Sequence, residues 1–276
     1  MIHENKKNLA GVPFENVLSC FLSAFEGYFI KLPEDPNYWW ERFTIARVNW
    51  ELSFGMFDED ELVGYIINCV DQHRESLTAY NTGTGVLPDY RGRAIVDQLY
   101  EHAIPVLKAH GVEKCLLEVI CENERALKVY NRIGFEITRQ LRSFTGSFPE
   151  TSSEITLQKC HFSQVIQSGL YKEALYSWDN SAKAVELMQN RVQTWCLGDP
   201  DSPEAYLVID NAGNIIQLFS KSDNYPGLLN AAGPLAKEVK LKNVSAGRES
   251  QINTLQKCHF SNPVNQYEME MEISSF

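Results

Sequence analysis

The sequence lacks several features that would place the protein in a membrane, in a secreted fraction or on a metal. No stretch approaches the roughly 20 apolar residues that span a bilayer. The first eight residues, Met1 to Asn8, lack the apolar region of a signal peptide. The seven cysteines show no paired short spacing, so neither a disulfide framework nor a zinc site is indicated. We therefore predict a cytoplasmic protein with reduced thiols, no metal and no membrane contact.

Positive charge is also scarce. The 276 residues contain 25 Lys and Arg against 36 Asp and Glu, which gives a formal net charge of −11 at pH 7. Because phosphate contacts need clustered basic side chains, this balance argues against nucleic acid as a partner. It suits a cationic substrate such as an amine, although an ordinary solvated acidic surface explains the charge more simply.

The first half of the chain alternates predicted helices and strands. Apolar residues recur at three- and four-residue steps over 15–29, and a second helical stretch over 37–47 carries Trp39, Trp40 and Phe43, which suit either the core or an amine pocket. Beyond these helices we predict strands at 50–57, 61–70, 77–86, 114–120 and 136–145, and helices at 93–110 and 123–132. This order favours a mixed sheet covered by helices.

The second half repeats this rhythm more faintly. A shift to Gly, Ser, Pro and Thr at 146–154 predicts a linker between domains at 1–147 and 154–276. The octapeptide TLQKCHFS occurs at 156–163 and at 254–261, but at different stages of the two halves, so it does not mark equivalent points of a tandem repeat. In the second half we predict helices at 164–177, 181–190, 226–237 and 248–257, and strands at 204–210, 214–220, 239–244 and 267–273.

The segment from Val86 to Val96, VLPDYRGRAIV, predicts a strand, a turn at Gly92 and the start of the long helix. Amide groups at a helix N-terminus have no intrahelical partners, and the helix dipole adds partial positive charge there. Together they form a site for an anion such as a pyrophosphate, to which Arg91 and Arg93 add charge. An ordinary strand-to-helix turn with solvated arginines explains this segment equally well by itself.

The downstream segment makes the pattern specific. From Leu117 to Phe135 it is LEVICENERALKVYNRIGF. This segment and VLPDYRGRA both resemble signatures of the GCN5-related N-acetyltransferase (GNAT) family, in the expected order and with the expected helix between them. The resemblance covers about residues 15–145 and is degenerate beyond. It implies an α/β (α+β) fold: a mixed, mostly antiparallel sheet flanked by helices, in two tandem copies.

The resemblance also implies an activity and its residues. The protein is expected to transfer an acetyl group from acetyl-CoA to a primary amine, of a small molecule, by direct transfer in a ternary complex. Thr84, Gly85 and Val86 would hold the pantetheine arm through backbone hydrogen bonds, and Asn123 would contact the same arm. The pyrophosphate would lie beside Arg91 on the backbone amides of Gly92, Arg93, Ala94, Ile95, Val96 and Asp97.

Two further residues match the catalytic positions of the family. Tyr130 stands where the family usually places the acid that protonates the leaving thiolate, and Glu118 matches the general base of members that acetylate protein N-termini. An ammonium must lose a proton before its nitrogen attacks a thioester, so a carboxylate nearby suits the reaction. Each residue also has a plainer interpretation, Glu118 as a solvent-facing strand residue and Tyr130 as a packed aromatic.

The loop departs from the family pattern R-x-x-G-x-G or R-x-x-G-x-A. With Arg91 first, Ala94 and Val96 take the two small positions; with Gly92 and Ala94 in those positions, Asp89 stands at the basic one. A non-catalytic acyl-CoA-binding or regulatory module therefore stays open, as does a peptide N-terminal acetyltransferase. The second copy lacks such a loop and has Leu255 in place of Tyr130, so we predict a degenerate domain there. A homodimer is left open.

Overall fold

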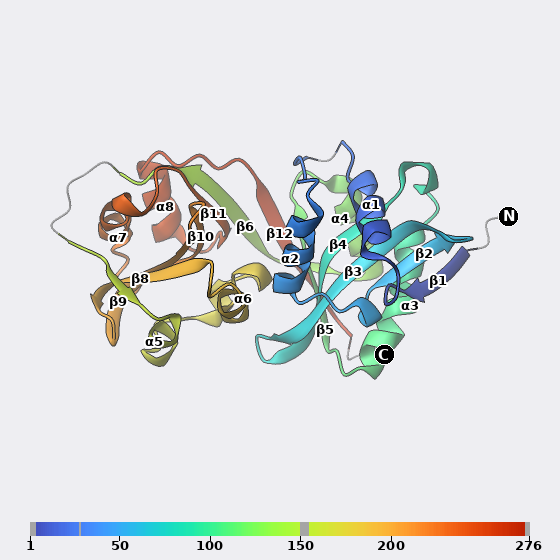
Figure 1. Ribbon diagram of the computed structural model, residues 1–276, viewed down its shortest axis with the longest axis horizontal. Helices are drawn as coiled ribbons and strands as arrows, with labels where there is room; N and C mark the ends of the chain where they lie inside the picture. The colour runs from blue at the N-terminus through green and yellow to red at the C-terminus, as the bar shows by residue number, and fades with distance from the viewer. Residues whose placement is uncertain (1–3, 28, 150–154, 274–276) are drawn as a thin grey trace. The chain divides into compact units, whose positions relative to one another are not determined.

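The computed structural model describes residues 4–27, 29–149 and 155–273, which fall into two compact units (Figure 1). The first unit comprises Met1–Thr138 together with Glu268–Phe276, and the second comprises Arg139–Tyr267. The residues from Glu268 onward, which we expected in the second copy, therefore group with the first unit. The centre of the expected linker, 150–154, lies outside the described residues.

The first unit is built on a mixed sheet. Its strand order is β1-β2-β3-β4-β5, with β12 next to β5. Each of the strands β1, β2 and β3 pairs antiparallel with the next strand in the chain, whereas β4 and β5 pair parallel. The strands are β1 (Glu4–Asn8), β2 (Phe54–Asp58), β3 (Glu61–His73), β4 (Ser76–Val86), β5 (Lys114–Ile120) and β12 (Asn265–Glu272).

Helices cover both faces of this sheet. Neighbouring residues of a strand point to opposite faces. On β3, Tyr65 packs its ring 5.7 Å from that of Phe21 in α1, whereas a Cβ at Gly64 would meet Ile95 of α3. Helix α1 therefore lies on one face and α3 on the other. The helices are α1 (Phe14–Ala24), α2 (Pro36–Ala46), α3 (Ile95–Ala109) and α4 (Glu124–Ile133).

The helix ends follow from local sequence. Asp35 caps α2 by accepting a hydrogen bond from the Asn37 amide at 2.9 Å, and Pro36 fits the first turn because it has no N–H to satisfy. Trp39 and Phe43 of this helix are buried in the core against α1, which makes them packing residues, whereas Trp40 is exposed. Helix α4 ends at Gly134, whose φ of 116° other residues rarely adopt.

The second unit has the same kind of sheet, in the order β6-β11-β10-β9-β8-β7. Strands β10 and β11 pair parallel and the other neighbours pair antiparallel. The strands are β6 (Glu136–Gly146), β7 (Gln158–Cys160), β8 (Val192–Asp199), β9 (Ser202–Asp210), β10 (Asn214–Ser220) and β11 (Val239–Ser245). The helices are α5 (Phe162–Gln167), α6 (Ala182–Leu187), α7 (Tyr225–Ala231) and α8 (Glu249–Lys257).

Both units thus have the predicted mixed, mostly antiparallel sheet flanked by helices. The predicted helix over 164–177 is wrong beyond Gln167, because Gly169 follows with a φ of 71° and ends the helical path. Strands β1, β7 and β8 were not predicted. Within the part of the chain that the structure describes, no helix combines the length and apolarity needed to cross a membrane.

Candidate functional site

Strands β4 and β5 separate halfway along their length. Their parallel register runs from Thr78 opposite Lys114 to Asn81 opposite Leu117 and ends there, although both strands continue. A β-bulge lies at the same point, since Gly83 and Asn81 of β4 oppose consecutive residues of β3 and leave an extra residue between them. The bulge bends β4 away from β5, so the segment that includes Thr84, Gly85 and Val86 runs beside a gap.

Glycine is required on this segment because α1 approaches it closely. A Cβ at Gly85 would lie 2.3 Å from the Tyr65 hydroxyl and 2.7 Å from Ala24, and one at Gly83 would lie 2.8 Å from the Phe21 ring. All three distances are shorter than a real Cβ tolerates. The two glycines therefore let helix α1 and Tyr65 pack directly on the β4 backbone.

A row of buried polar side chains marks the same bulge. Thr84 donates a hydrogen bond to Asn81 at 2.8 Å, and Asn81 donates to Asn68 of β3 at 3.3 Å. Asn68 in turn donates to the Leu52 carbonyl at 2.7 Å. Buried amides that satisfy one another fix a single local geometry. The row thereby holds the bulge and the start of the gap in place.

The loop after β4 contains two residues with left-handed backbone. Gly92 has a φ of 81° and Ala94 a φ of 54°, whereas Val96 lies inside α3. Residues that alternate between left- and right-handed conformations turn successive amides toward one point. Ala94 is also the N-cap of α3, whose dipole points the same way.

The charged side chains of this loop bind the protein itself. Arg91 donates to the Val86 carbonyl at 3.2 Å and to the Ala24 carbonyl at 3.0 Å, and so joins the ends of β4 and α1. Arg93 donates to the Asp89 carbonyl at 3.1 Å and lies over the Tyr90 ring. The two arginines thus shape the loop.

Asp97 and Asn123 also have structural partners. Asp97 accepts two hydrogen bonds from Arg132 of α4, at 2.6 and 2.7 Å, and this pairing lowers the pKa of the Asp97 carboxyl. The side-chain oxygen of Asn123 caps α4 by accepting from the Ala126 amide at 3.1 Å. The Asp97 side chain therefore joins α3 to α4, and Asn123 fixes where α4 begins.

Tyr130 is the residue of α4 that points into the core near the gap. Tyr130 is 9% exposed, and the centre of its ring lies 5.8 Å from that of Phe135. Burial raises the pKa of both Tyr65 and Tyr100 well above the usual value, and the neighbouring Tyr130 raises both further. The side chains of Tyr65 and Tyr100 therefore stay protonated at neutral pH.

Glu118 lies on β5 where this strand stops pairing with β4. It is half-buried on β5, one residue past the last paired residue, Leu117. Since neighbouring residues of a strand point to opposite faces, Glu118 shares its face of β5 with Leu116.

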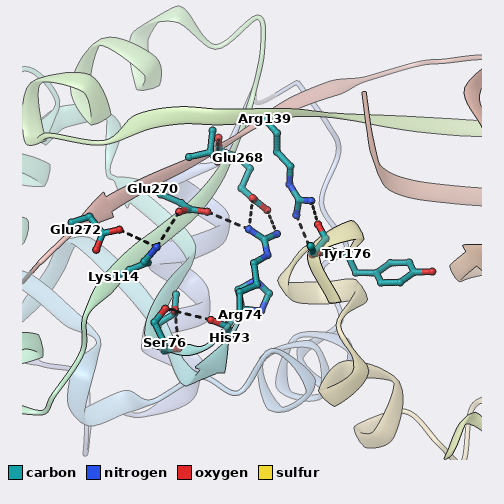
Figure 2. Close-up of polar contacts among 12 residues, drawn as sticks. His73, Arg74, Ser76, Lys114, Arg139, Tyr176, Glu268, Glu270 and Glu272 are labelled. Carbon is teal, nitrogen blue, oxygen red and sulfur yellow. Dashed lines mark hydrogen bonds and ion pairs between the residues drawn. The ribbon is translucent and has the colours of Figure 1, made fainter. Parts of the chain in front are cut away.

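The last strand of the chain adds a charged cluster that sequence reasoning missed (Figure 2). Arg74, at the turn between β3 and β4, donates to the fully buried Glu268 at 2.9 and 3.2 Å and to Glu270 at 3.2 Å. Lys114 of β5 pairs with Glu272 at 2.9 Å. The alternation EMEMEI was visible in the sequence, but it did not reveal these partners from strands far away along the chain.

Comparison with known proteins agrees with this geometry. Residues 14–135 match the family model described as the acetyltransferase (GNAT) family. The first unit belongs to the GNAT family. N-alpha-acetyltransferase 30 of Schizosaccharomyces pombe is 34% identical over 86 residues, 31% of this chain and 57% of that protein. A mycothiol acetyltransferase of Corynebacterium glutamicum is 32% identical over 82 residues, 30% of this chain and 27% of that protein. The chain thus spans about half, or less, of the length of these relatives.

The GNAT fold extends to the second unit. A tandem GNAT protein from the clavulanic acid biosynthesis pathway matches 99% of this chain and 100% of its own with a TM-score of 0.70, at 12% identity. The predicted tandem arrangement of GNAT folds is therefore confirmed.

In the second GNAT fold the corresponding gap is filled. Strands β10 and β11 pair in parallel only at Asn214 and Ile215, and β10 has a bulge just beyond. Arg248, the N-cap of α8, donates to the Leu218 carbonyl of β10 at 2.7 Å and to the Tyr225 hydroxyl at 3.2 Å. Its guanidinium thus binds backbone on the part of β10 that follows the bulge.

Proposed function

We propose that the protein is an acetyl-CoA-dependent N-acetyltransferase whose first GNAT unit acetylates a primary amine of a small molecule. The observation that carries the proposal is the gap between β4 and β5, which leads at one end to the left-handed loop before α3 and lies beside the buried Tyr130. This combination offers backbone hydrogen bonds to an extended arm, an anion site for a pyrophosphate and a proton donor near the point where the strands part.

The chain's own residues divide the binding between them. The backbone of Thr84, Gly85 and Val86 holds the pantetheine arm along the gap. The amides from Gly92 to Asp97 bind the pyrophosphate, helped by the positive end of the α3 dipole. Asn123 keeps the start of α4 beside the arm. These roles need no side-chain charge, which fits arginines that already bind the protein backbone.

Two residues move protons. Glu118, directly or through water, accepts the proton that the attacking ammonium must lose. Tyr130 donates its proton to the CoA sulfur as the carbon–sulfur bond breaks. Such positioned acids and bases each accelerate reactions by about 10²- to 10⁴-fold. Holding the amine against the thioester supplies a further part of the acceleration.

A second candidate is acetylation of a peptide N-terminus. The similarity to N-alpha-acetyltransferase 30 of Schizosaccharomyces pombe favours it, as does the position of Glu118. The similarity to a mycothiol acetyltransferase favours a small molecule instead. Both acceptors present a primary amine, so the same gap, acid and base serve either reaction.

The test is an assay of thiol release from acetyl-CoA with a panel of acceptors: polyamines, aminoglycosides, amino acids, and short peptides with free or blocked N-termini. We expect turnover with at least one free amine and about a hundredfold loss in Tyr130→Phe. Acetyl-CoA affinity, measured by calorimetry, should stay unchanged in that variant. Binding of acetyl-CoA with no turnover of any acceptor would indicate a non-catalytic acyl-CoA-binding module, and no binding at all would refute the proposal.

A further inference from the structure

Tyr100 of α3 is a buried residue beside the proposed acid. It is 2% exposed, and its ring lies 5.5 Å from that of Phe135, edge to face. Phe135 also contacts Tyr130, at 5.8 Å. The two tyrosine rings therefore pack on the same phenylalanine, one from α3 and the other from α4.

The Tyr100 hydroxyl is unpaired. Among the described residues, its oxygen is buried and has no hydrogen-bond partner. Burial raises the pKa of Tyr100 well above its usual value, and the neighbouring Tyr130 and Cys115 raise it further. The Thr84 hydroxyl lowers the same pKa. Thr84, however, donates its own proton to Asn81. Tyr100 therefore keeps its proton at neutral pH, and its hydroxyl makes no hydrogen bond among the described residues in the resting structure.

An unpaired buried hydroxyl destabilises a protein, because its desolvation is not offset. Ring packing alone does not explain it, since phenylalanine would make the same contact with Phe135 without that cost. Buried polar groups left unpaired in this way call for a partner that forms only at some stage of function, or for a bound water. Tyr130, whose ring packs on the same Phe135 as that of Tyr100, becomes such a partner during the proposed reaction.

We propose that Tyr100 is a positioning residue for Tyr130, whose hydroxyl donates a hydrogen bond to the Tyr130 oxygen as that oxygen becomes negatively charged. The inference rests on the proposed function. As the carbon–sulfur bond of the thioester breaks, its electron pair stays on sulfur, and sulfur takes the Tyr130 proton. Tyr130 becomes a phenolate, Tyr100 keeps its own proton, and Tyr130 later regains a proton from solvent, to which Glu118 releases the one taken from the amine.

This interaction would exist in the transition state and be absent from the resting protein. Interactions of that kind raise turnover without tightening substrate binding. Because hydrogen bonds to a charged oxygen are the strong ones, the loss of the Tyr100 hydroxyl should lower kcat by about ten- to a hundredfold. Neither KM nor the dissociation constant for acetyl-CoA should change.

The experiment compares Tyr100→Phe, Tyr130→Phe and the double variant in full-length protein. Thiol release from acetyl-CoA is measured with the acceptor that gives the fastest turnover in the panel described under the proposed function. A second assay contains no amine, so that water is the only acceptor. We expect Tyr100→Phe to lower kcat, to leave the acetyl-CoA affinity unchanged and to leave the melting temperature equal or higher. In the Tyr130→Phe background, removing the Tyr100 hydroxyl should have no further effect.

Tyr206→Phe in the second unit is the matched control. Its buried hydroxyl donates to Gln217 at 2.9 Å, so its removal should lower the melting temperature and leave kcat unchanged. An unchanged kcat in Tyr100→Phe would overturn the inference, as would equal losses from Tyr100→Phe with and without the Tyr130 hydroxyl. A lower melting temperature would show that the hydroxyl has a resting partner such as buried water, and would also overturn it. If wild type releases no thiol, the proposed function fails instead.

Discussion

The two GNAT units share a sheet with one parallel strand pair that separates, but they treat the gap differently. In the first unit the backbone of β4 beyond the bulge faces α1 through glycines, and the start of α4 carries Asn123. In the second unit the matching position at the start of α8 is Arg248, which binds the backbone of β10. At matching helix starts, the second unit therefore has a charged residue that binds the neighbouring strand, where the first unit has the neutral Asn123.

The units also differ at their last strand. The second unit draws its described strands from one continuous stretch of chain, whereas the first unit includes Glu268–Glu272 from the far end of the sequence. Glu268 is fully buried there and needs Arg74 as its partner. The first unit therefore depends on residues that follow the whole second unit in the chain.

The largest expected effect tests this dependence. Glu268→Ala should reduce the stability of the first unit by about 3 kcal/mol, because it leaves the partly buried Arg74 guanidinium without its main partner. Hydrogen exchange should show faster exchange in β3 and β4 and no change in β9 and β10. Glu272→Ala, at the exposed pair with Lys114, is the control and should cost at most about 1 kcal/mol. Equal effects of the two variants would contradict the dependence.

The next effect concerns the filled gap. Arg248→Ala should reduce the stability of the second unit by about 2 kcal/mol, because it removes charged hydrogen bonds to Leu218 and Tyr225. Calorimetry of the wild type should show one acetyl-CoA site per chain, and the affinity of that site should be the same in the variant. Two sites in the wild type would break the comparison between the units.

A smaller effect concerns the open gap. In Gly85→Ala the new Cβ would clash with Tyr65 and Ala24, so we expect a loss of about 1–2 kcal/mol in stability and a weaker acetyl-CoA affinity. Gly247→Ala in the second unit, where a Cβ meets nothing within 4 Å, should change neither. Full acetyl-CoA affinity in Gly85→Ala would argue against β4 as the place of the pantetheine arm.

The smallest effect is pH-dependent. Arg132 lowers the pKa of Asp97 below its usual value of 3.8, so the ion pair stabilises the folded state above that pH. Its contribution should disappear as the pH falls through the lower, folded-state pKa. The melting temperature of Asp97→Asn should therefore lie slightly below that of wild type at pH 7, and the two should converge in acid. Glu124→Gln, at an exposed helix pair, should show no such convergence.

Much of the first unit could be predicted from sequence alone. The strand over 114–120 and the helix that carries Tyr130 have strong local patterns, and the structure has them within a residue or so. Strand β8 was missed because its own residues show no clear strand pattern. Its residues Trp195 and Cys196 form a strand because they pair with residues of β7 on one side and of β9 on the other. Tyr100 was missed for a similar reason, since only the packing of α3 against Phe135 brings it beside Tyr130.

The loop at Gly92 shows where sequence reasoning stopped within the site. Two registers of the motif fitted the letters equally, since both place small or nearly small residues before the helix. The structure adds that Ala94 has a positive φ and that Val96 lies inside α3. Backbone conformation at a non-glycine residue depends on the surrounding structure, so no count of residue types could have revealed it.

The repeated octapeptide shows most clearly what local sequence determines and what the tertiary structure determines. At 156–163, TLQKCHFS contains strand β7 and the first residues of α5, whereas at 254–261 the same letters contain the end of α8 and a turn. In the first copy Cys160 pairs with Thr194 of β8; in the second, Leu255 is buried in the core of the second unit. The sequence by itself determined the family motifs and the alternation of elements. The tertiary structure decided what these eight residues form, because hydrogen-bond partners and buried contacts outweigh the small propensity differences within a short peptide.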